Sequence, residues 1–425
     1  MNQIASQNAP SPTVVVPHFI FGGLTLLITA LLIVFHPEAF TQHFFNAPLL
    51  SITHLLALGW ITMIIFGALY QLLPVIMEVK LYSEFLAKFS FVFLAVGTVL
   101  LGAAFWRLSF GLLMLVAATF VVLSVTSFLI NVLLTAKTSQ KKIIERTFII
   151  CSAFWFLFTV LAGLTLAVNL MYPFLKVSHI ELLKLHAHAG IVGWFIQLVI
   201  GVSVKLLPMF MVSHSVSTKR LYYTLYFVNI GLLSGIISLY FQFKPVLLGS
   251  SLLVVTGIVI YLYFLLKSYK KRVKKQLDIG MKQTMLSFGI LVIPLFLILI
   301  LLFNFSVLKT FTLPLSIAYG SAIIIGFVTS LVMGQTYKTL PFIVWLKVYR
   351  GRVGKVVLPL PKDLYSEKIA TTQTWLFATG FGILLTGIST TIEELIVAGG
   401  AGLLLSTLLY NFNLLKIVFH KAKNK

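Results

Sequence analysis

The sequence predicts an all-α polytopic membrane protein with twelve transmembrane helices in three pseudosymmetric four-helix repeats. Three observations lead to this fold class. Hydrophobic residues make up 59% of the 425 residues and charged residues only 10%, and the mean hydropathy is +1.04, which is too apolar for a soluble enzyme. The apolar residues form long runs, and one of these runs recurs three times. We expect a single transmembrane domain over residues 1–425, with repeats at approximately 1–140, 141–275 and 276–425.

Twelve apolar runs are each about 20 residues long, the length that a helix needs to cross a bilayer. In chain order they begin near Pro17, Leu49, Leu86, Phe110, Thr147, Leu183, Leu221, Leu247, Thr284, Leu315, Thr372 and Leu395. The first run lacks a basic n-region and a small-residue cleavage site, so we do not expect a cleavable signal peptide.

The basic residues predict how the chain is threaded through the membrane. Lys and Arg number 25 in the loops after even-numbered helices and the C-terminal tail, and 5 in the opposite loops. Basic loops stay on the cytoplasmic side, so we expect both termini there, in a cell inner membrane. This asymmetry accounts for the net charge of +22 without a nucleic-acid partner. The densest basic run, 267–276, is interpreted as a loop beside anionic lipid headgroups.

An internal repeat covers three of the predicted helices. The segments HLLALGWITMIIFGALYQLLP, HAGIVGWFIQLVIGVSVKLLP and SAIIIGFVTSLVMGQTYKTLP align without gaps at 54–74, 188–208 and 321–341. The shared positions are Gly59, Gly193 and Gly326, then Gly67, Gly201 and Gly334, then Leu73, Leu207 and Leu340, and finally Pro74, Pro208 and Pro341. The copies fall on helices 2, 6 and 10, so the repeating unit is four helices.

The repeated spacing suggests a use for the glycines and prolines. Each proline is expected to end or kink its helix. Glycines eight residues apart lie near one helix face, where another backbone or a flat ligand can come close. Between the second glycine and the proline, one aligned position of the repeat is occupied by Gln71, Lys205 and Lys338. These three are interpreted either as a shared ion or proton site or as side chains that extend to the membrane surface.

The histidines are the main candidate ligands. The single cysteine, Cys151, excludes an intrachain disulfide and a thiolate cluster, so metal chemistry would have to use histidine. His54 and His188 share one repeat position, where the third copy has Ser321. His186 lies two residues from His188, which places it on another face of the helix. Five further histidines are expected at or near helix ends or in loops: His18, His36, His43, His214 and His420.

His54 and His188 are expected a turn or two below the outer membrane surface, where an imidazole needs a hydrogen bond, a metal or a haem iron as its partner. Of these, haem iron is the expected one. Haem requires one or two axial imidazoles and an apolar cleft, whereas a structural or catalytic metal wants three or four ligands. Copper is therefore not expected. In this interpretation His54, with His188 or His186, ligates haem iron. Room for the macrocycle comes from Gly59, Gly67, Gly193 and Gly201, its lining from Trp60 and Trp194, and a propionate contact from Arg107.

These segments resemble the catalytic subunit of the haem-copper oxidases and its offshoots, including nitric oxide reductases and NnrS-type haem proteins. The motifs HLLALGW, HAHAGIVGWF and GQTYKTLPFIVW are most similar to short oxidase-subunit-I-like proteins of bacteria. The resemblance implies twelve helices in three arcs, with His54 matching the helix 2 ligand of the low-spin haem and His188 matching more loosely.

The departures from this family pattern bear on activity. Helix 10 (SIAYGSAIIIGFVTSLVMGQTYK) and helix 7 (LYYTLYFVNIGLLSGIISLYF) contain no histidine, so the usual binuclear oxygen-reducing centre cannot be built. The arginine pair between helices 11 and 12 is replaced by STTIEELI, with Glu393 and Glu394. Ordinary cytochrome oxidase activity is therefore not expected.

Three functions remain open on the sequence. The first is a haem-binding membrane protein that serves electron transfer, nitric oxide handling, or haem and copper homeostasis. The second is a haem-free transporter or channel on the same scaffold, with Gln71, Lys205 and Lys338 along its pathway. The third is a non-catalytic partner of a respiratory or metal-enzyme assembly, whose best contact surface is the loop at 346–368.

Overall fold

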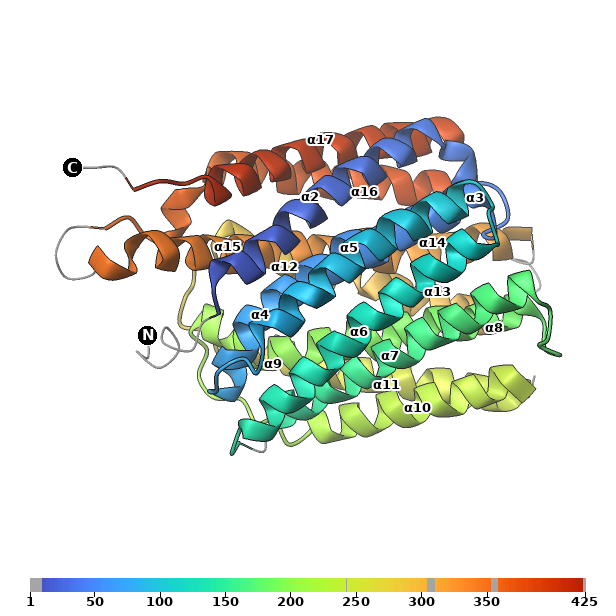
Figure 1. The fold of residues 1–425 in the computed structure, drawn as a ribbon, viewed down its shortest axis with the longest axis horizontal. Coiled ribbons are helices and arrows are strands. Elements are labelled where there is room, and N and C mark those ends of the chain that lie inside the picture. The colour runs from blue at the N-terminus through green and yellow to red at the C-terminus, as the bar shows by residue number, and fades with distance from the viewer. Residues whose placement is uncertain (1–9, 142, 242, 304–309, 353–357, 423–425) are drawn as a thin grey trace. The chain divides into compact units, whose positions relative to one another are not determined.

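The computed structural model describes residues 10–141, 143–241, 243–303, 310–352 and 358–422, and their regular structure is helical (Figure 1). The long helices are α2 (Pro12–Phe35), α3 (Ala47–His54), α4 (Met63–Met77), α5 (Glu84–Trp106), α6 (Leu112–Thr138), α7 (Ile144–Met171), α8 (His179–His188), α9 (Gln197–Met211), α10 (Leu221–Phe241), α11 (Lys244–Lys270), α12 (Ile279–Ile290), α13 (Val292–Phe303), α14 (Thr312–Ser321), α15 (Thr329–Tyr349), α16 (Glu367–Thr390) and α17 (Glu393–Val418). Three π-helical segments join some of these into longer rods: η2 (Leu55–Thr62), η3 (Ala189–Ile196) and η5 (Ala322–Val328). Short 3-10 turns occur at η1 (Pro37–Phe40), η6 (Arg350–Arg352) and η7 (Pro361–Leu364).

Eleven helical rods in the described residues are long and apolar enough to cross a membrane, so the chain is a multi-pass membrane protein. The sequence predicts twelve. The remaining long helix, α16, has 24 residues but is less apolar, because threonines occupy much of its surface. The hydroxyls of Thr379, Thr386 and Thr390 each donate to the carbonyl four residues earlier, at 2.8 to 2.9 Å.

Side-chain caps fix where several helices begin. The side chains of Ser11, Asn46, Asp278 and Ser366 each accept a hydrogen bond from a backbone amide two or three residues later, which satisfies one of the unpaired amides of the first turn. A proline directly follows Ser11, and its fixed φ suits the first helical position. Helix α2 therefore begins five residues before the predicted Pro17.

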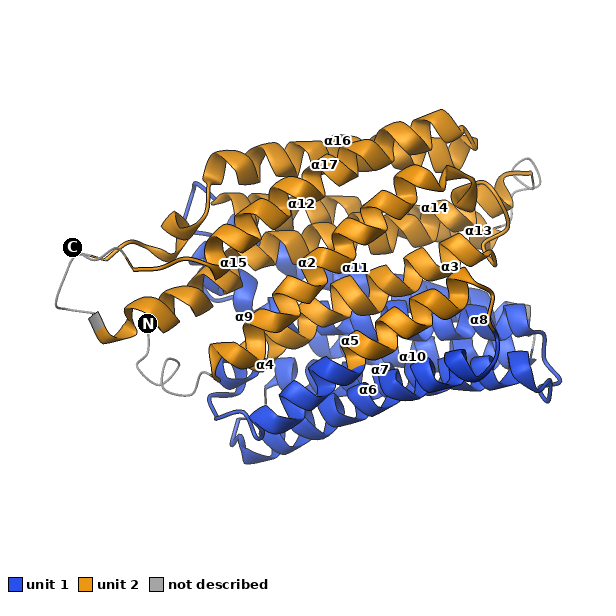
Figure 2. Cartoon of the chain, turned by 45° about the horizontal axis from the view of Figure 1, so that its top comes forward, with its two compact units in different colours: residues 1–9, 72–93, 110–277 blue, residues 10–71, 94–109, 278–425 orange. Residues whose placement is uncertain are grey.

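The chain divides into two compact units (Figure 2). Unit 1 contains residues 1–9, 72–93 and 110–277, and unit 2 contains residues 10–71, 94–109 and 278–425. These boundaries do not coincide with those of the predicted repeats, because α4 and α5 each contribute one part to either unit.

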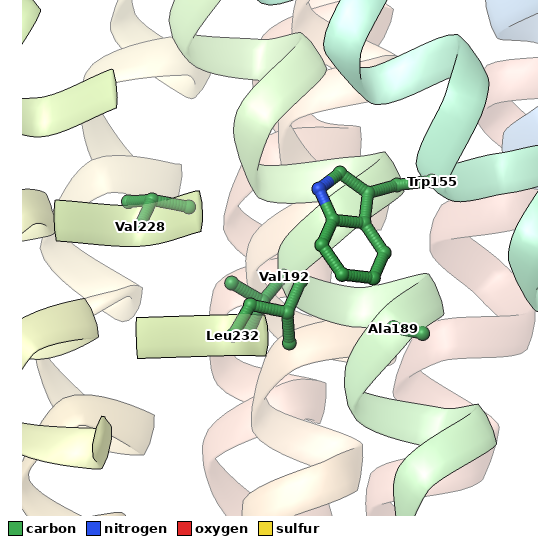
Figure 3. Close-up of a cluster of buried hydrophobic side chains, with 5 residues drawn as sticks. All are labelled: Trp155, Ala189, Val192, Val228 and Leu232. Carbon is green, nitrogen blue, oxygen red and sulfur yellow. The ribbon is translucent and has the colours of Figure 1, made fainter. Parts of the chain in front are cut away.

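In unit 1, α6 packs on α7, α7 packs on α9 and η3, and α10 packs on α11 and α8. A buried apolar cluster joins α7, η3 and α10 (Figure 3); it consists of Trp155, Ala189, Val192, Val228 and Leu232. Burial of these side chains stabilises the contact between the first helix of the predicted second repeat and its π-helical segment.

In unit 2, α17 packs on both α16 and α2, and α12 packs on α15. The contact between α16 and α17 brings two backbones together. A Cβ atom on Gly380 would lie 2.9 Å from the backbone carbon of Gly402, and one on Gly399 would meet the backbone nitrogen of Leu384. Close approach at small residues is how membrane helices gain contact area where both surfaces are apolar.

The π-helical segments recur with the spacing of the sequence repeat. They begin at Leu55, Ala189 and Ala322, which are 134 and 133 residues apart. Each follows directly on the repeat position occupied by His54, His188 or Ser321. Single π-helical turns inside α-helices are rare and frequent at functional sites. The sequence repeat is thus accompanied by a repeated local conformation.

The repeated prolines lie inside their helices. Helices α4 and α9 continue for three residues past Pro74 and Pro208 and end at Met77 and Met211. The next residues, Glu78 and Val212, both have a left-handed φ, of 57° and 50°. Helix α15 continues for eight residues past Pro341. The first two prolines therefore precede equivalent helix ends, and the third does not.

Gly380 and Gly382 in α16 form a matched pair for testing the contact between α16 and α17. We expect Gly380→Ala to lower the thermal unfolding midpoint of the detergent-purified protein, because overpacking against a backbone costs about 1–3 kcal/mol. At Gly382 no atom lies within 4 Å of the position that a Cβ would take, so Gly382→Ala is expected to leave the midpoint unchanged or to raise it slightly. Equal midpoints for both variants would contradict this packing.

Candidate functional site

His54 and His188 hold their imidazoles in the same way. His54 is the last residue of α3, and its Nδ1 lies 2.8 Å from the carbonyl oxygen of Leu50. His188 is the last residue of α8, and its Nδ1 lies 2.8 Å from the carbonyl oxygen of Lys184. A carbonyl can only accept, so in each neutral ring Nδ1–H donates and Nε2 is the basic nitrogen. Both side chains are half-buried.

This geometry matches what an iron or metal ligand requires. A ligating imidazole commonly donates its other N–H to a backbone carbonyl, which fixes the tautomer and the ring orientation and raises the basicity of the ligating nitrogen. His54 belongs to unit 2 and His188 to unit 1, so each is a candidate ligand within its own unit. The third copy has Ser321, which is buried.

The ring of His54 has an aromatic neighbour. The ring of His54 stacks on Phe105 of α5, with ring centroids 4.4 Å apart and an angle of 26° between the planes. Arg107 lies two residues beyond Phe105 and is exposed, so it belongs to the same end of this helix pair as His54. This placement is compatible with the predicted contact between Arg107 and an acidic group beside His54.

His186 makes a different contact. Its Nδ1 lies 3.0 Å from the carbonyl oxygen of Thr159 on α7, and its ring lies against Gly163. His186 therefore joins α8 to α7, whereas His188 repeats the geometry of His54. The sequence alone did not decide between His186 and His188.

The prediction that His18 lies near a helix end is wrong. Because α2 begins at Pro12, His18 lies in its second turn and is fully buried. Its Nδ1 is 2.8 Å from the carbonyl oxygen of Val14, and its ring makes an edge contact with Tyr70. The cap at Ser11 and the proline after it were the signals that could have corrected the helix start.

The glycines expected to leave room for a macrocycle are covered by protein side chains. A Cβ atom on Gly59 would meet Thr25, and one on Gly67 would meet His18. The equivalent atoms on Gly193 and Gly201 would meet Trp155 and Phe148. All four glycines thus serve close contacts between helices of the same unit.

The two tryptophans are also packed in the protein interior. Trp60 donates from Nε1 to the hydroxyl of Thr329 at 3.2 Å and makes an edge contact with Tyr410. Trp194 stacks on Phe156, with centroids 4.4 Å apart. A macrocycle on His54 or His188 would therefore lie away from the surfaces that these glycines and tryptophans occupy.

Gln71, Lys205 and Lys338 have three different environments. Lys338 pairs with Asp278 at 2.7 Å, and the two side chains are 18% and 20% exposed. Lys205 is exposed. The hydrogen bond and the charge of Lys141 lower the pKa of Glu78, which lies in the loop after α4. The charge of Lys205 lowers this pKa further, by a smaller amount. Gln71 is buried, and its Nε2 has no hydrogen-bond partner among the described residues.

A buried polar cluster in unit 2 was missed in the sequence. Gln373 Nε2 donates to Ser406 Oγ at 3.1 Å and lies 3.3 Å from Met333 Sδ. Gln283 approaches the same sulfur and accepts from the hydroxyl of Thr374 at 3.2 Å. Polar side chains inside membrane helices are costly unless they are satisfied in this way. Their spacing along α12, α15, α16 and α17 gave no local signal, because the partners come from separate helices.

Unit 1 has a smaller polar cluster. Trp155 Nε1 donates to Asn229 Oδ1 at 2.8 Å, and Asn229 Nδ2 donates to Gln197 Oε1 at 2.7 Å. Gln197 is fully buried, and its Nε2 has no hydrogen-bond partner among the residues described. In the part of the chain that the structure describes, no three His, Cys, Asp or Glu side chains come together as metal ligands.

No protein-family model matches the chain, and a comparison with curated proteins finds no match. The functional interpretation consequently depends on the residues and their geometry.

The equivalent positions Lys338 and Lys205 allow a controlled test of the ion pair in unit 2. Lys338→Gln leaves Asp278 largely buried and without its cation, which we expect to cost roughly 1–3 kcal/mol of stability. Lys205→Gln changes an exposed side chain and should alter stability by less than about 0.5 kcal/mol. Thermal unfolding of both purified variants measures the difference, and a larger loss in Lys205→Gln would refute the assignment.

Proposed function

We propose that the protein is an integral membrane haem protein, with haem iron bound by His54 and a second iron bound by His188. The observation that carries this proposal is the shared geometry of the two imidazoles. Each donates from Nδ1 to the carbonyl four residues earlier, at 2.8 Å, and each directly precedes a π-helical segment. His18 makes the same hydrogen bond to Val14, so what supports ligation is the recurrence of this imidazole at equivalent repeat positions, each directly before a π-helical segment.

The protein's own groups would position the iron ligand. The carbonyl oxygens of Leu50 and Lys184 hold the rings, Phe105 limits rotation of the His54 ring, and Arg107 offers a positive charge for a propionate. Bound haem would supply an iron centre for electron transfer or for binding a diatomic gas such as nitric oxide. A respiratory-chain or other electron-donor protein is the partner that these roles require. The resemblance to the haem-copper oxidase catalytic subunit supports the same class of cofactor.

We extend this proposal to the membrane topology. The twelfth span is α16, whose contact with α17 and internally bonded threonines suit a membrane helix. The recurrence of the π-helical segments supports three four-helix repeats. With both termini in the cytoplasm, the basic loops face the anionic inner leaflet of the cell inner membrane.

A haem-free transporter or channel is the second candidate, and two observations favour it. The glycines predicted to accommodate a macrocycle are covered by side chains, and Gln71 buries an amide nitrogen that has no partner among the described residues. Buried polar groups of this kind, together with the Gln283 and Gln373 cluster, are typical of pathways for polar solutes or ions.

The visible absorption spectrum of the detergent-purified protein, oxidised and then dithionite-reduced, tests the haem proposal. We expect a Soret band, of which His54→Ala and His188→Ala each lose about half, since each removes one axial ligand. The matched controls are His214→Ala, an exposed histidine, and His186→Ala, which should reduce stability but retain the band.

A colourless protein from haem-supplemented cells, or a band equally reduced in the His214→Ala control, would overturn the haem proposal and leave the transporter as the better candidate. If the band is present, adding carbon monoxide shows whether the iron has an open coordination position.

A further inference from the structure

In unit 1, several cations lie over aromatic rings at the start of α10 and the end of α11. The ring of Tyr263 lies 4.7 Å from Lys267 Nζ and 5.7 Å from the guanidinium carbon of Arg220. The first of these cations belongs to α11 and the second directly precedes α10. Two cations on one ring repel each other, so an anion between them would stabilise the arrangement.

The neighbouring loops are fixed against each other rather than extended into solvent. The amide of His214 donates to the carbonyl of Lys271 at 3.2 Å, and the Lys271 ammonium donates to the carbonyl of Ser215 at the same distance. Arg272 lies over the ring of Tyr269, 3.8 Å from its centroid, and donates to the Tyr269 carbonyl. Lys271 and Arg272 are thus held in place by the protein, which reduces the ordering cost of binding a ligand beside them.

No carboxylate of unit 1 neutralises this group in the described residues. The chain has no acidic residue between Glu181 and Asp278. The ion pairs described in unit 1 are Lys141 with Glu78 and Lys184 with Glu181, and neither involves Arg220, Lys267, Lys271 or Arg272. A ligand of opposite charge must therefore come from outside this part of the protein.

The surroundings indicate the depth of the group in the membrane. Tyr222, Tyr223 and Tyr226 are exposed on the adjoining turns of α10, and further along the same helix Ile230 and Leu233 are exposed. Tyrosines collect at the level of the lipid headgroups, and exposed aliphatic side chains face the acyl chains. The cations therefore stand at the level of the phosphates.

We infer that Arg220 and Lys267, with Tyr263 between them, form a binding site for the phosphate of an anionic phospholipid. The two cations contact the phosphodiester, and the exposed face of α10 contacts the acyl chains. Lys271 and Arg272 add positive charge from the adjoining loop. This site is independent of haem, so its test can fail while the proposed function holds, and the reverse.

Native mass spectrometry of the full-length protein in detergent tests the site, with phosphatidylglycerol and phosphatidylcholine of identical acyl chains as the probes. We expect the unmodified protein to prefer phosphatidylglycerol. In the Arg220→Gln/Lys267→Gln double variant the affinity for phosphatidylglycerol should fall by about 25-fold, because each cation near the surface contributes about fivefold. The affinity for phosphatidylcholine, whose phosphate charge is balanced by its own choline cation, should fall much less.

The matched control is Lys362→Gln/Lys368→Gln, which removes the same charge from exposed residues of unit 2. The control should keep the preference. If the double variant is unstable, Tyr263→Leu, which keeps both charges but removes the ring and the hydroxyl that position them, should lower the preference.

Three results would overturn the site. The first is that the unmodified protein binds phosphatidylglycerol and phosphatidylcholine equally. The second is that the Lys362→Gln/Lys368→Gln control loses as much affinity for phosphatidylglycerol as the double variant. The third is that an equal concentration of inorganic phosphate displaces the lipid. The last result would identify a site for free anions instead.

Discussion

Close approach of helix backbones at glycine is the constraint on which the packing of both units depends. In a bilayer, lipid is as apolar as the helix surfaces, so helices associate through contact area and through satisfied polar groups rather than through expulsion of water. Gly67 lets its helix lie directly against α2 at His18, and Gly201 lets α9 lie directly against α7 at Phe148. Gly334 does the same against Thr284. The same helices then hold the π-helical segments and the candidate ligands in place.

The buried polar side chains follow from this packing. Once α16 and α17 meet at Gly380 and Gly399, Gln373 and Ser406 face each other and satisfy one another's hydrogen-bonding groups. Lipid cannot do so, and each unsatisfied group would cost several kcal/mol there. A helix with as many threonines and glycines as α16 is therefore best suited to a position against another helix.

Hydropathy predicted the order of the long helices, because a bilayer selects apolar runs of fixed length, and eleven of the twelve expected spans are long and apolar enough to cross a membrane. The largest differences in helix starts are Pro17 against Pro12, Thr284 against Ile279 and Thr372 against Glu367, where capped, more polar turns precede the apolar run. For the candidate site, the repeat identified His54 and His188 as equivalent positions. It did not show whether His186 or His188 is the candidate ligand, because that depends on the contact of His186 with a carbonyl of α7. The polar cluster of unit 2 and the pairing of Lys338 with Asp278 depend on residues from other helices, which no local pattern shows. The π-helical turns were also missed, because they need no particular residue type.

The π-helical segments also set the rotational phase of each rod. A π-turn takes up extra residues without lengthening the rod in proportion, and one residue corresponds to about 100° of rotation in an α-helix. In each rod, the residue at the histidine position lies on one side of this phase change, and the second glycine and the proline lie on the other. A one-residue deletion inside η2, η3 or η5 would turn the whole C-terminal half of that rod relative to its N-terminal half. The three segments thus act as angular offsets between the part of each helix that carries the repeated histidine or serine position and the part that carries the second glycine and the proline, so the two parts can be selected separately.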